Sequence, residues 1–358
     1  MLDISSRPDA GALAVAARNA WALSPFGEGI EAPSPLPSTV VYSAAHCTVR
    51  LYHGPADASL NPVLLVPPLA VPISCYDLRA GQSLAAHLVA SGRPTYVVDY
   101  GRIRYADRGM GFEDWFADIV PTALRQASAH AGGAQLDIIA WSLGGTISLL
   151  TAAANTGLPL RSITTLGTPI DYRHNPSTTP LRLVGKLVPP AVMSSALWAV
   201  GGIPSPLVKV SYRSTALQRE LTRPWFITRN LANSESLAQM EAIDRFMSAM
   251  PGYPARLYTQ MHQRLILRND LMRGVLRFGE HRVNLADVDV PVLAFGGASD
   301  VLAPLDCVAP IADVLTGAPS VRVEVVPGSH LGMVSGNQAE EHTWPVIDEF
   351  HSELCVPV

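Results

Sequence analysis

A short apolar run that ends at a serine between small residues constrains the fold of this chain more than any other feature. Residues 136–141 read LDIIAW, which is typical of a buried strand, and the next four residues are SLGG. A helical pattern without proline follows at once over 146–154. A sharp turn of this kind needs small neighbours and lifts the serine hydroxyl above the edge of a sheet. We therefore predict that Ser142 is a nucleophile at the end of a strand, with Ala140 where the usual G-x-S-x-G pattern has its first glycine.

Two later segments carry the partners that a catalytic serine needs. The apolar run 290–295 leads into a glycine-rich loop with Asp300, and the run 321–326 leads into a loop with His330. A serine hydroxyl is a weak nucleophile unless a nearby base takes its proton. We predict that His330 is this base and that Asp300 orients its imidazole. Asp171, which follows an earlier apolar run, remains as the alternative acid.

Backbone N–H groups would stabilise the negative charge that develops on the substrate oxygen. One belongs to Leu143, directly after the serine, and the other comes from the loop after an early strand. The run 63–66 is that strand, and Pro67 and Pro68 after it have no N–H to donate. Leu69 is therefore predicted as the second donor of the oxyanion hole.

The order of serine, acid and histidine, each after a separate apolar run, predicts an α/β fold. We expect the α/β-hydrolase fold, in which a mostly parallel central sheet is flanked by helices. Residues 40–172 and 282–358 would form its core, 173–281 an inserted and mainly helical cap, and 1–39 an N-terminal helical arm and linker. A chain of 358 residues with 48% hydrophobic content is sufficient for one such unit.

The predicted cap contains a stretch without charged residues, 187–208. Four prolines and two glycines within it argue against an unbroken membrane-spanning helix. We expect this stretch to cover the active site, where Leu197 and Trp198 would line an acyl-chain pocket together with Trp141 from the core. The sequence leaves open the alternative that these apolar side chains form only the core of the cap itself.

Composition argues against several kinds of partner. The net charge of −4 gives no support to nucleic-acid binding. The cysteines at positions 47, 75, 307 and 355 lack metal-ligand spacing, so we expect no metal, no cofactor and thiols in a reducing compartment. No basic cluster precedes an apolar run at the start of the sequence, and we therefore expect a cytoplasmic protein without a signal peptide.

Several segments between residue 40 and the C-terminus give the chain a resemblance to a known family. They lie at 66–68, 96–101, 167–172, 202–204, 283–293 and 328–332. In these segments the chain resembles class III polyhydroxyalkanoate synthase catalytic subunits and related α/β-hydrolases. The resemblance implies an α/β-hydrolase fold and chemistry on acyl groups that are carried as esters or thioesters.

Two residues depart from the pattern of that family. The synthases have a cysteine nucleophile where this chain has Ser142, and a histidine directly after the catalytic aspartate where this chain has Val301. A thiolate forms a thioester that can acylate an alcohol, whereas an acyl-serine is an ordinary ester that water usually discharges. The serine therefore favours a hydrolase over a polymerase.

We accordingly expect a serine hydrolase of the esterase, lipase or thioesterase type. It would cleave esters or thioesters of apolar acyl or hydroxyacyl groups through an acyl-serine intermediate, with an apolar ester, a lipid or an acyl-CoA as substrate. Two alternatives stay open: a synthase-like acyltransferase that uses CoA thioesters, and a non-catalytic binding subunit. Peripheral contact with lipid, at a membrane or a lipid inclusion, and a homodimer are further expectations that the sequence does not decide.

Overall fold

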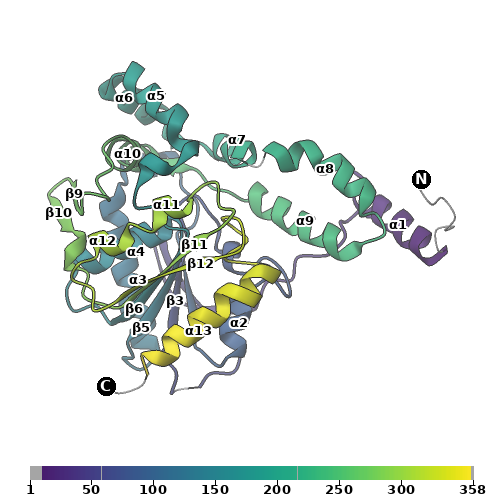
Figure 1. Ribbon diagram of the computed structural model, residues 1–358, viewed down its shortest axis with the longest axis horizontal. Helices are drawn as coiled ribbons and strands as arrows, with labels where there is room; N and C mark the ends of the chain where they lie inside the picture. The colour runs from purple at the N-terminus through teal and green to yellow at the C-terminus, as the bar shows by residue number, and fades with distance from the viewer. Residues whose placement is uncertain (1–9, 58, 216, 356–358) are drawn as a thin grey trace.

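An eight-stranded sheet forms the centre of the molecule (Figure 1). The computed structural model describes residues 10–57, 59–215 and 217–355, with the backbone alone at 212–215 and 217–220. The strand order is β1-β2-β4-β3-β5-β6-β11-β12, and neighbours are parallel except where β2 pairs with β1 and β4. The strands are β1 (Ser38–Ala44), β2 (Cys47–Tyr52), β3 (Val63–Val66), β4 (Thr95–Asp99), β5 (Leu136–Trp141), β6 (Leu160–Leu166), β11 (Val292–Gly297) and β12 (Val321–Val326).

Helices cover both faces of the sheet, and alternate side chains of each strand point to opposite faces. Leu64 of β3 and Ile138 of β5 pack on one face together with α3 and α4. The next residues, Leu65 and Ile139, pack on the other face together with α2 and α13. Because both faces are covered, the central strands are continuous apolar runs rather than alternating ones. The four helices are α2 (Leu84–Ala90), α3 (Val120–His130), α4 (Leu143–Ala154) and α13 (Trp344–Glu353).

The segment between β6 and β11, which contains the predicted cap, is mainly helical. Its helices are α5 (Thr179–Leu187), α6 (Pro190–Val200), α7 (Ser205–Thr215), α8 (Leu217–Arg229), α9 (Ser234–Ser248) and α10 (Ala255–Gln260), and a π-helical segment follows at Met261–Leu267. Two short antiparallel pairs accompany them: β7 (Gly202–Ile203) with β8 (Tyr253–Pro254), and β9 (Val275–Phe278) with β10 (His281–Asn284). The predicted return to the core at residue 282 thus falls within β10.

Two parts of the cap project from the core in different directions (Figure 1). Helices α5 and α6 lie over one end of the sheet, whereas α8 and α9 extend sideways and meet the N-terminal helix α1 (Ala10–Ala22). The buried Asn19 of α1 donates to the carbonyl of Leu231 and to Ser234 Oγ. These bonds fix the predicted N-terminal arm to the cap.

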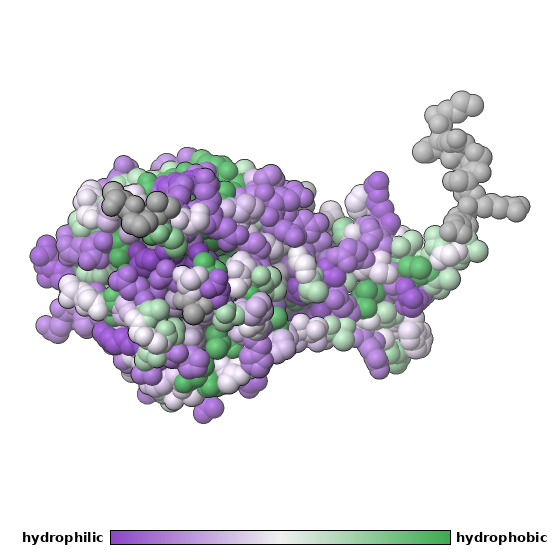
Figure 2. Space-filling view, turned by 90° about the horizontal axis from the view of Figure 1, so that it is seen from below, coloured by the Kyte–Doolittle hydropathy of each residue, from purple (hydrophilic) through white to green (hydrophobic). Residues whose placement is uncertain are grey.

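Large apolar side chains remain exposed on these projecting helices, for example Trp21 on α1 and Leu187 on α5. Figure 2 shows apolar residues in small patches among polar ones on one face of the molecule. In the described ranges no single helix is both long and apolar enough to cross a bilayer. The helices at 176–187 and 190–200 meet that test only as a pair, and they are bent by 110° at the break between them.

A buried group of charged and polar residues lies at the beginning of β5. The fully buried Asp137 accepts hydrogen bonds from Ser162 Oγ and from Arg161, and it is 3.3 Å from Arg93 Nη1. His351 of α13 is fully buried nearby, with Nε2 3.9 Å from Asp137 Oδ2 and no hydrogen bond to either ring nitrogen. Burial lowers the pKa of His351 to about 4, against the opposing charge of Asp137.

We predict that His351 makes the protein less stable in mild acid. A histidine in the unfolded chain titrates near pH 6.5, so the neutral buried ring contributes stability above that pH, and this stability is lost as pH falls towards 4. Between pH 7 and pH 4.5 the loss should be on the order of 2–3 kcal/mol in the free energy of unfolding. His351→Leu should remove this part of the slope in urea unfolding curves. Parallel pH profiles for the two proteins would contradict the prediction.

Candidate active site

Ser142 occupies a strained turn between β5 and α4. Its φ of 52° and ψ of −122° lie in a region that residues other than glycine rarely adopt. The turn is held by close packing on both sides. A Cβ at Gly144 would overlap the carbonyl oxygen of Val66, and one at Gly145 would overlap Thr168 Oγ1. The two glycines of the sequence motif are therefore required by the neighbours of the helix, and they place the first turn of α4 against the end of β3.

Asp300 and His330 form a hydrogen-bonded pair on the loops after β11 and β12. Asp300 Oδ2 is 2.7 Å from His330 Nδ1, and both residues are buried. Asp300 Oδ1 accepts from the N–H groups of Leu302 and Ala303 at 2.8 and 2.9 Å. Burial alone would raise the pKa of Asp300, but the bond to His330 and the two N–H groups outweigh it and hold the pKa below its ordinary value. The carboxylate thus stays ionised beside the imidazole.

Two residues contact His330 next to the turn: Trp141 at the end of β5 and Gly167 directly after β6. The rings of Trp141 and His330 are 5.2 Å apart, and Trp141 Nε1 donates to the carbonyl oxygen of His330 at 3.0 Å. Gly167, directly after β6, has φ +58°, and a Cβ there would lie 3.1 Å from His330 Nδ1. No hydrogen bond between Ser142 and His330 occurs in the described chain. Such bonds are often long before substrate binds, and His330 Nε2 is free to make one because Nδ1 is held by Asp300.

The predicted oxyanion donors lie on adjoining segments. Gly144, the residue after Leu143, packs against Val66 and Pro67, which lead to Leu69. Tyr76 fixes this region: its hydroxyl donates to the carbonyl of Val66 at 2.7 Å and accepts from the N–H of Trp141 at 3.0 Å. Within the described chain, the N–H groups of Leu143 and Leu69 donate to no backbone or side-chain acceptor. Both therefore remain predicted donors to a substrate oxygen.

The alternative acid, Asp171, lies in a different set of contacts. Its carboxylate accepts from the backbone and side chain of Arg173 and from Asn269 Nδ2. The side-chain bonds from Arg173 lower the pKa of Asp171 to about 2, against the opposing effect of burial. His330 is bonded to Asp300 and not to Asp171.

The predicted pocket residues are not gathered at one place. Trp141 is buried against His330 and Phe246. Trp198, by contrast, is 46% exposed on α6, where the Arg108 guanidinium lies 5.0 Å from its ring. Leu197 is half-buried on the same helix. Their role in binding an acyl chain remains a prediction.

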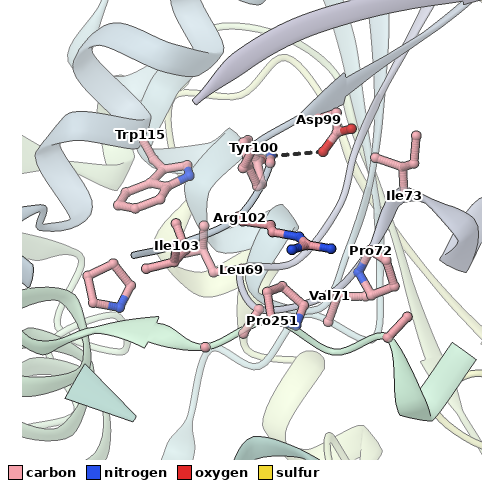
Figure 3. A pocket seen from close by; sticks show the side chains of 15 residues that line it. Leu69, Val71, Pro72, Ile73, Asp99, Tyr100, Arg102, Ile103, Trp115 and Pro251 are labelled. Atoms are coloured by element: carbon pink, nitrogen blue, oxygen red, sulfur yellow. Dashed lines mark hydrogen bonds between the residues drawn. The ribbon is translucent and has the colours of Figure 1, made fainter. Parts of the chain in front are cut away.

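A cavity with a volume of about 250 Å³ adjoins the predicted oxyanion loop (Figure 3). Its walls come from the loops after β3 (69–73) and β4 (99–103), from Trp115, and from four cap residues between 249 and 254. Neither Leu197 nor Trp198 lines this cavity. The sequence carries no signal for this cavity, because its walls come from four separate segments of the chain that have no common motif.

The cysteines form no metal site. Cys47, Cys75 and Cys307 are buried and Cys355 is exposed, and all four are free thiols. Burial raises the pKa of the Cys75 thiol well above its ordinary value. In the part of the chain that the structure describes, no group of three or more His, Cys, Asp or Glu side chains could hold a metal ion.

The architecture and the position of Ser142 after β5 define the α/β-hydrolase fold. A lipase in its open form superposes on 90% of this chain and all of its own, with a TM-score of 0.57 and 12% identity. A hydrolase from Oleispira antarctica covers 86% of this chain and 95% of its own, with a TM-score of 0.50 and 13% identity.

In sequence, the chain resembles poly(3-hydroxyalkanoate) polymerase subunits PhaC over nearly its whole length. The subunit of Allochromatium vinosum is 22% identical over 328 residues, which span 88% of each chain. The subunit of Thiocystis violacea is 21% identical with the same coverage, and that of Synechocystis is 22% identical over 82% of this chain and 78% of its own. No family model matches the chain.

The contacts of the two aspartates lead to opposite predictions for their asparagine variants. Asp300→Asn should lower kcat by about 10⁴-fold, because an amide favours the wrong imidazole tautomer. Asp171→Asn should change kcat little but lower stability by about 1–3 kcal/mol, because it weakens buried charge-assisted hydrogen bonds. Ester hydrolysis and urea unfolding of both variants test this. The reverse ranking of kcat would assign the acid to Asp171.

We predict that Trp141 positions His330 through its indole N–H. Trp141→Phe keeps a ring against His330 but removes the bond to the His330 carbonyl. It should lower kcat by about 2- to 10-fold with little change in KM, as expected for one neutral hydrogen bond. An effect confined to KM would instead favour the sequence-based prediction that Trp141 contacts substrate.

Proposed function

We propose that the protein is a serine hydrolase that cleaves esters or thioesters of apolar acyl or hydroxyacyl groups. The observation that carries the proposal is the combination of Ser142 on a strained turn with the Asp300–His330 pair beside it. Each residue follows a different strand of one sheet, so the fold itself holds them at one edge. A non-catalytic binding subunit would have no need of a buried, ionised carboxylate on His330.

In the acylation step, His330 Nε2 takes the proton of Ser142 Oγ as the oxygen attacks the carbonyl carbon. The negative charge moves to the carbonyl oxygen, where the N–H groups of Leu143 and Leu69 would donate to it. Asp300 accepts from Nδ1 and stabilises the imidazolium. The bond to the leaving alcohol or thiol then breaks, and His330 returns the proton to it.

In the second step, His330 takes a proton from water, which attacks the acyl-serine. The bond to Ser142 Oγ breaks, Oγ regains a proton from His330, and the free acid leaves. Because an oxyester is the intermediate, water is a competent acceptor, and this supports hydrolysis as the main outcome.

The second candidate is acyl transfer from a CoA thioester to a growing polyester. The full-length similarity to PhaC polymerase subunits favours it. Its chemistry would differ only in the acceptor, a hydroxyl group in place of water.

The proposal for the protein as a whole also includes its location and partners. We propose that it lies in the cytoplasm, makes peripheral contact with lipid, forms a homodimer and has no nucleic-acid partner.

We predict that Ser142 is acylated during turnover. A fluorophosphonate probe should label the wild-type protein covalently at Ser142. Ser142→Ala should abolish the labelling and lower kcat by roughly 10⁶-fold, as in other serine triads. The test is mass spectrometry of the labelled peptide together with hydrolysis of p-nitrophenyl acyl esters of graded length. Labelling that persists in the alanine variant would disprove the assignment.

Ser142→Cys separates the two candidate reactions. With 3-hydroxybutyryl-CoA, the wild-type protein should release free 3-hydroxybutyrate, whereas polymer as the main product would favour the synthase alternative. The cysteine variant would form a thioester, which transfers more readily to alcohols. Its ratio of oligomer to free acid should therefore exceed that of the wild type.

A further inference from the structure

Helices α5 and α6 carry an exposed apolar surface at the end of the molecule that carries the candidate active site. They project from the core over one end of the sheet (Figure 1). Asn175, four residues before α5, donates to the carbonyl of Leu302 at 2.6 Å. Leu302 lies in the loop of Asp300, so a partner bound to the two helices would lie at the same end of the molecule as Ser142.

Helix α5 has one side against the protein and the other in solvent. Gly185 faces inward, where a Cβ would lie 2.8 Å from the side chain of Leu267. Leu183 and Leu187 lie about 200° around the helix from Gly185. Both are exposed, and Leu187 has 74% of its surface in solvent.

Helix α6 is arranged in the same way. Trp198 lies over the Arg108 guanidinium, whereas Val192 and Val200 are exposed, with 66% of the surface of Val200 in solvent. Neither helix has a buried residue. Grouped apolar side chains that a soluble protein leaves exposed are typical of an interaction surface, and the charges around them indicate the partner.

The charge of this region is positive, although the chain as a whole has a net charge of −4. Between Asp171 and Glu220 the sequence has no acidic residue. The same stretch has six basic ones, at Arg173, Arg182, Lys186, Lys209, Arg213 and Arg219. Lys186 on α5 is exposed, as is Arg268 directly after the π-helical segment that α5 contacts. No described carboxylate forms an ion pair with either, so both are free to bind an anion from outside.

Acidic residues near these helices are engaged elsewhere or belong to the core. Asp270 is 3.6 Å from Arg264 Nη1. Asp107, in the turn that contacts α6, is 3.1 Å from His46 Nε2. Asp306 is exposed on α11 (Leu305–Val308), which packs on β11 and on the turn at 172–174. The surface of α5 and α6 therefore combines apolar side chains with an excess of positive charge.

We propose that α5 and α6 bind the protein to the surface of a lipid bilayer with anionic headgroups. The exposed leucine and valine side chains enter the boundary of the acyl chains, and Lys186 and Arg268 pair with headgroup phosphates. A second copy of the chain fits less well, because two surfaces of the same positive charge repel each other. The inference rests on the lipid contact in the proposed function, since a bilayer here would hold apolar acyl groups at the end that carries Ser142.

Co-sedimentation of the full-length Ser142→Ala protein with vesicles tests the surface without turnover. One set of vesicles is phosphatidylcholine alone, and the other is phosphatidylcholine mixed with phosphatidylglycerol. Lys186→Gln combined with Arg268→Gln should weaken binding to the anionic vesicles roughly 5- to 30-fold and change binding to the neutral ones little. Added salt should weaken binding of the unsubstituted surface to the anionic vesicles.

Leu187→Ser combined with Val200→Ser should weaken binding to both kinds of vesicle, by about 10- to 100-fold, because less apolar surface is buried. Arg125→Gln on α3 and Val325→Ser on β12 replace exposed residues elsewhere and are the matched controls. They should change binding to neither. With Ser142 restored, all of these variants should hydrolyse soluble p-nitrophenyl acetate at the wild-type rate.

Two results would overturn the proposal: no binding to anionic vesicles, or binding that neither pair of substitutions weakens. An equal loss on neutral and anionic vesicles in the Lys186 and Arg268 variant would overturn the role of the anionic headgroups. Sedimentation velocity without lipid tests the other occupant. If the Leu187 and Val200 variant loses a dimer but still binds vesicles, the surface is an interface between copies and the proposal is wrong. Absence of Ser142 labelling would disprove the proposed hydrolase, while the vesicle result would stand by itself.

Discussion

The close approach of the first turn of α4 to its neighbours is the constraint on which the site depends. Gly144 lies against the end of β3 and Gly145 against Thr168, with no room for a side chain on either. This packing compensates for the unfavourable backbone of Ser142. The same packing joins the start of α4 to the segment that leads to Leu69, so it bears on both the nucleophile and the expected oxyanion donors. A methyl group at either glycine would therefore be expected to disturb the whole site.

Much of this arrangement can be read from the sequence because it is local. The run 136–141 is a strand and Gly144 and Gly145 open a helix, as their pattern predicts. The segments before Asp300 and His330 likewise form the last two strands of the sheet. In a parallel sheet the carboxyl ends of the strands share one edge, so the pairing of two loop residues follows from strand order once the strands are recognised.

The remainder depends on contacts that no local pattern encodes. Asp171 also follows a strand, and only the positions of Arg173 and Asn269 show that its carboxylate is engaged elsewhere. The apolar stretch of the cap drew attention to Trp198, yet the cavity beside Leu69 is built by other residues. Trp115 gives no signal in the sequence, because a buried indole beside apolar residues resembles any other core residue until the cavity that it lines is seen.

The two ends of β5 differ in role: the first makes buried ionic contacts, and the second leads into the turn that carries Ser142. Asp137 near its start is tied to Arg161 on the neighbouring strand and to Ser162, while Ser142 follows its last residue. Sliding β5 along the sheet would separate the fully buried Asp137 from Arg161, and an unpaired buried charge has a high energetic cost. The contact between Asp137 and Arg161 thus fixes the register of β5 with β6 at the edge of the sheet opposite Ser142. The position of Ser142 at the opposite edge is therefore determined by two things: the ion pair at the start of β5 and the number of residues in that strand.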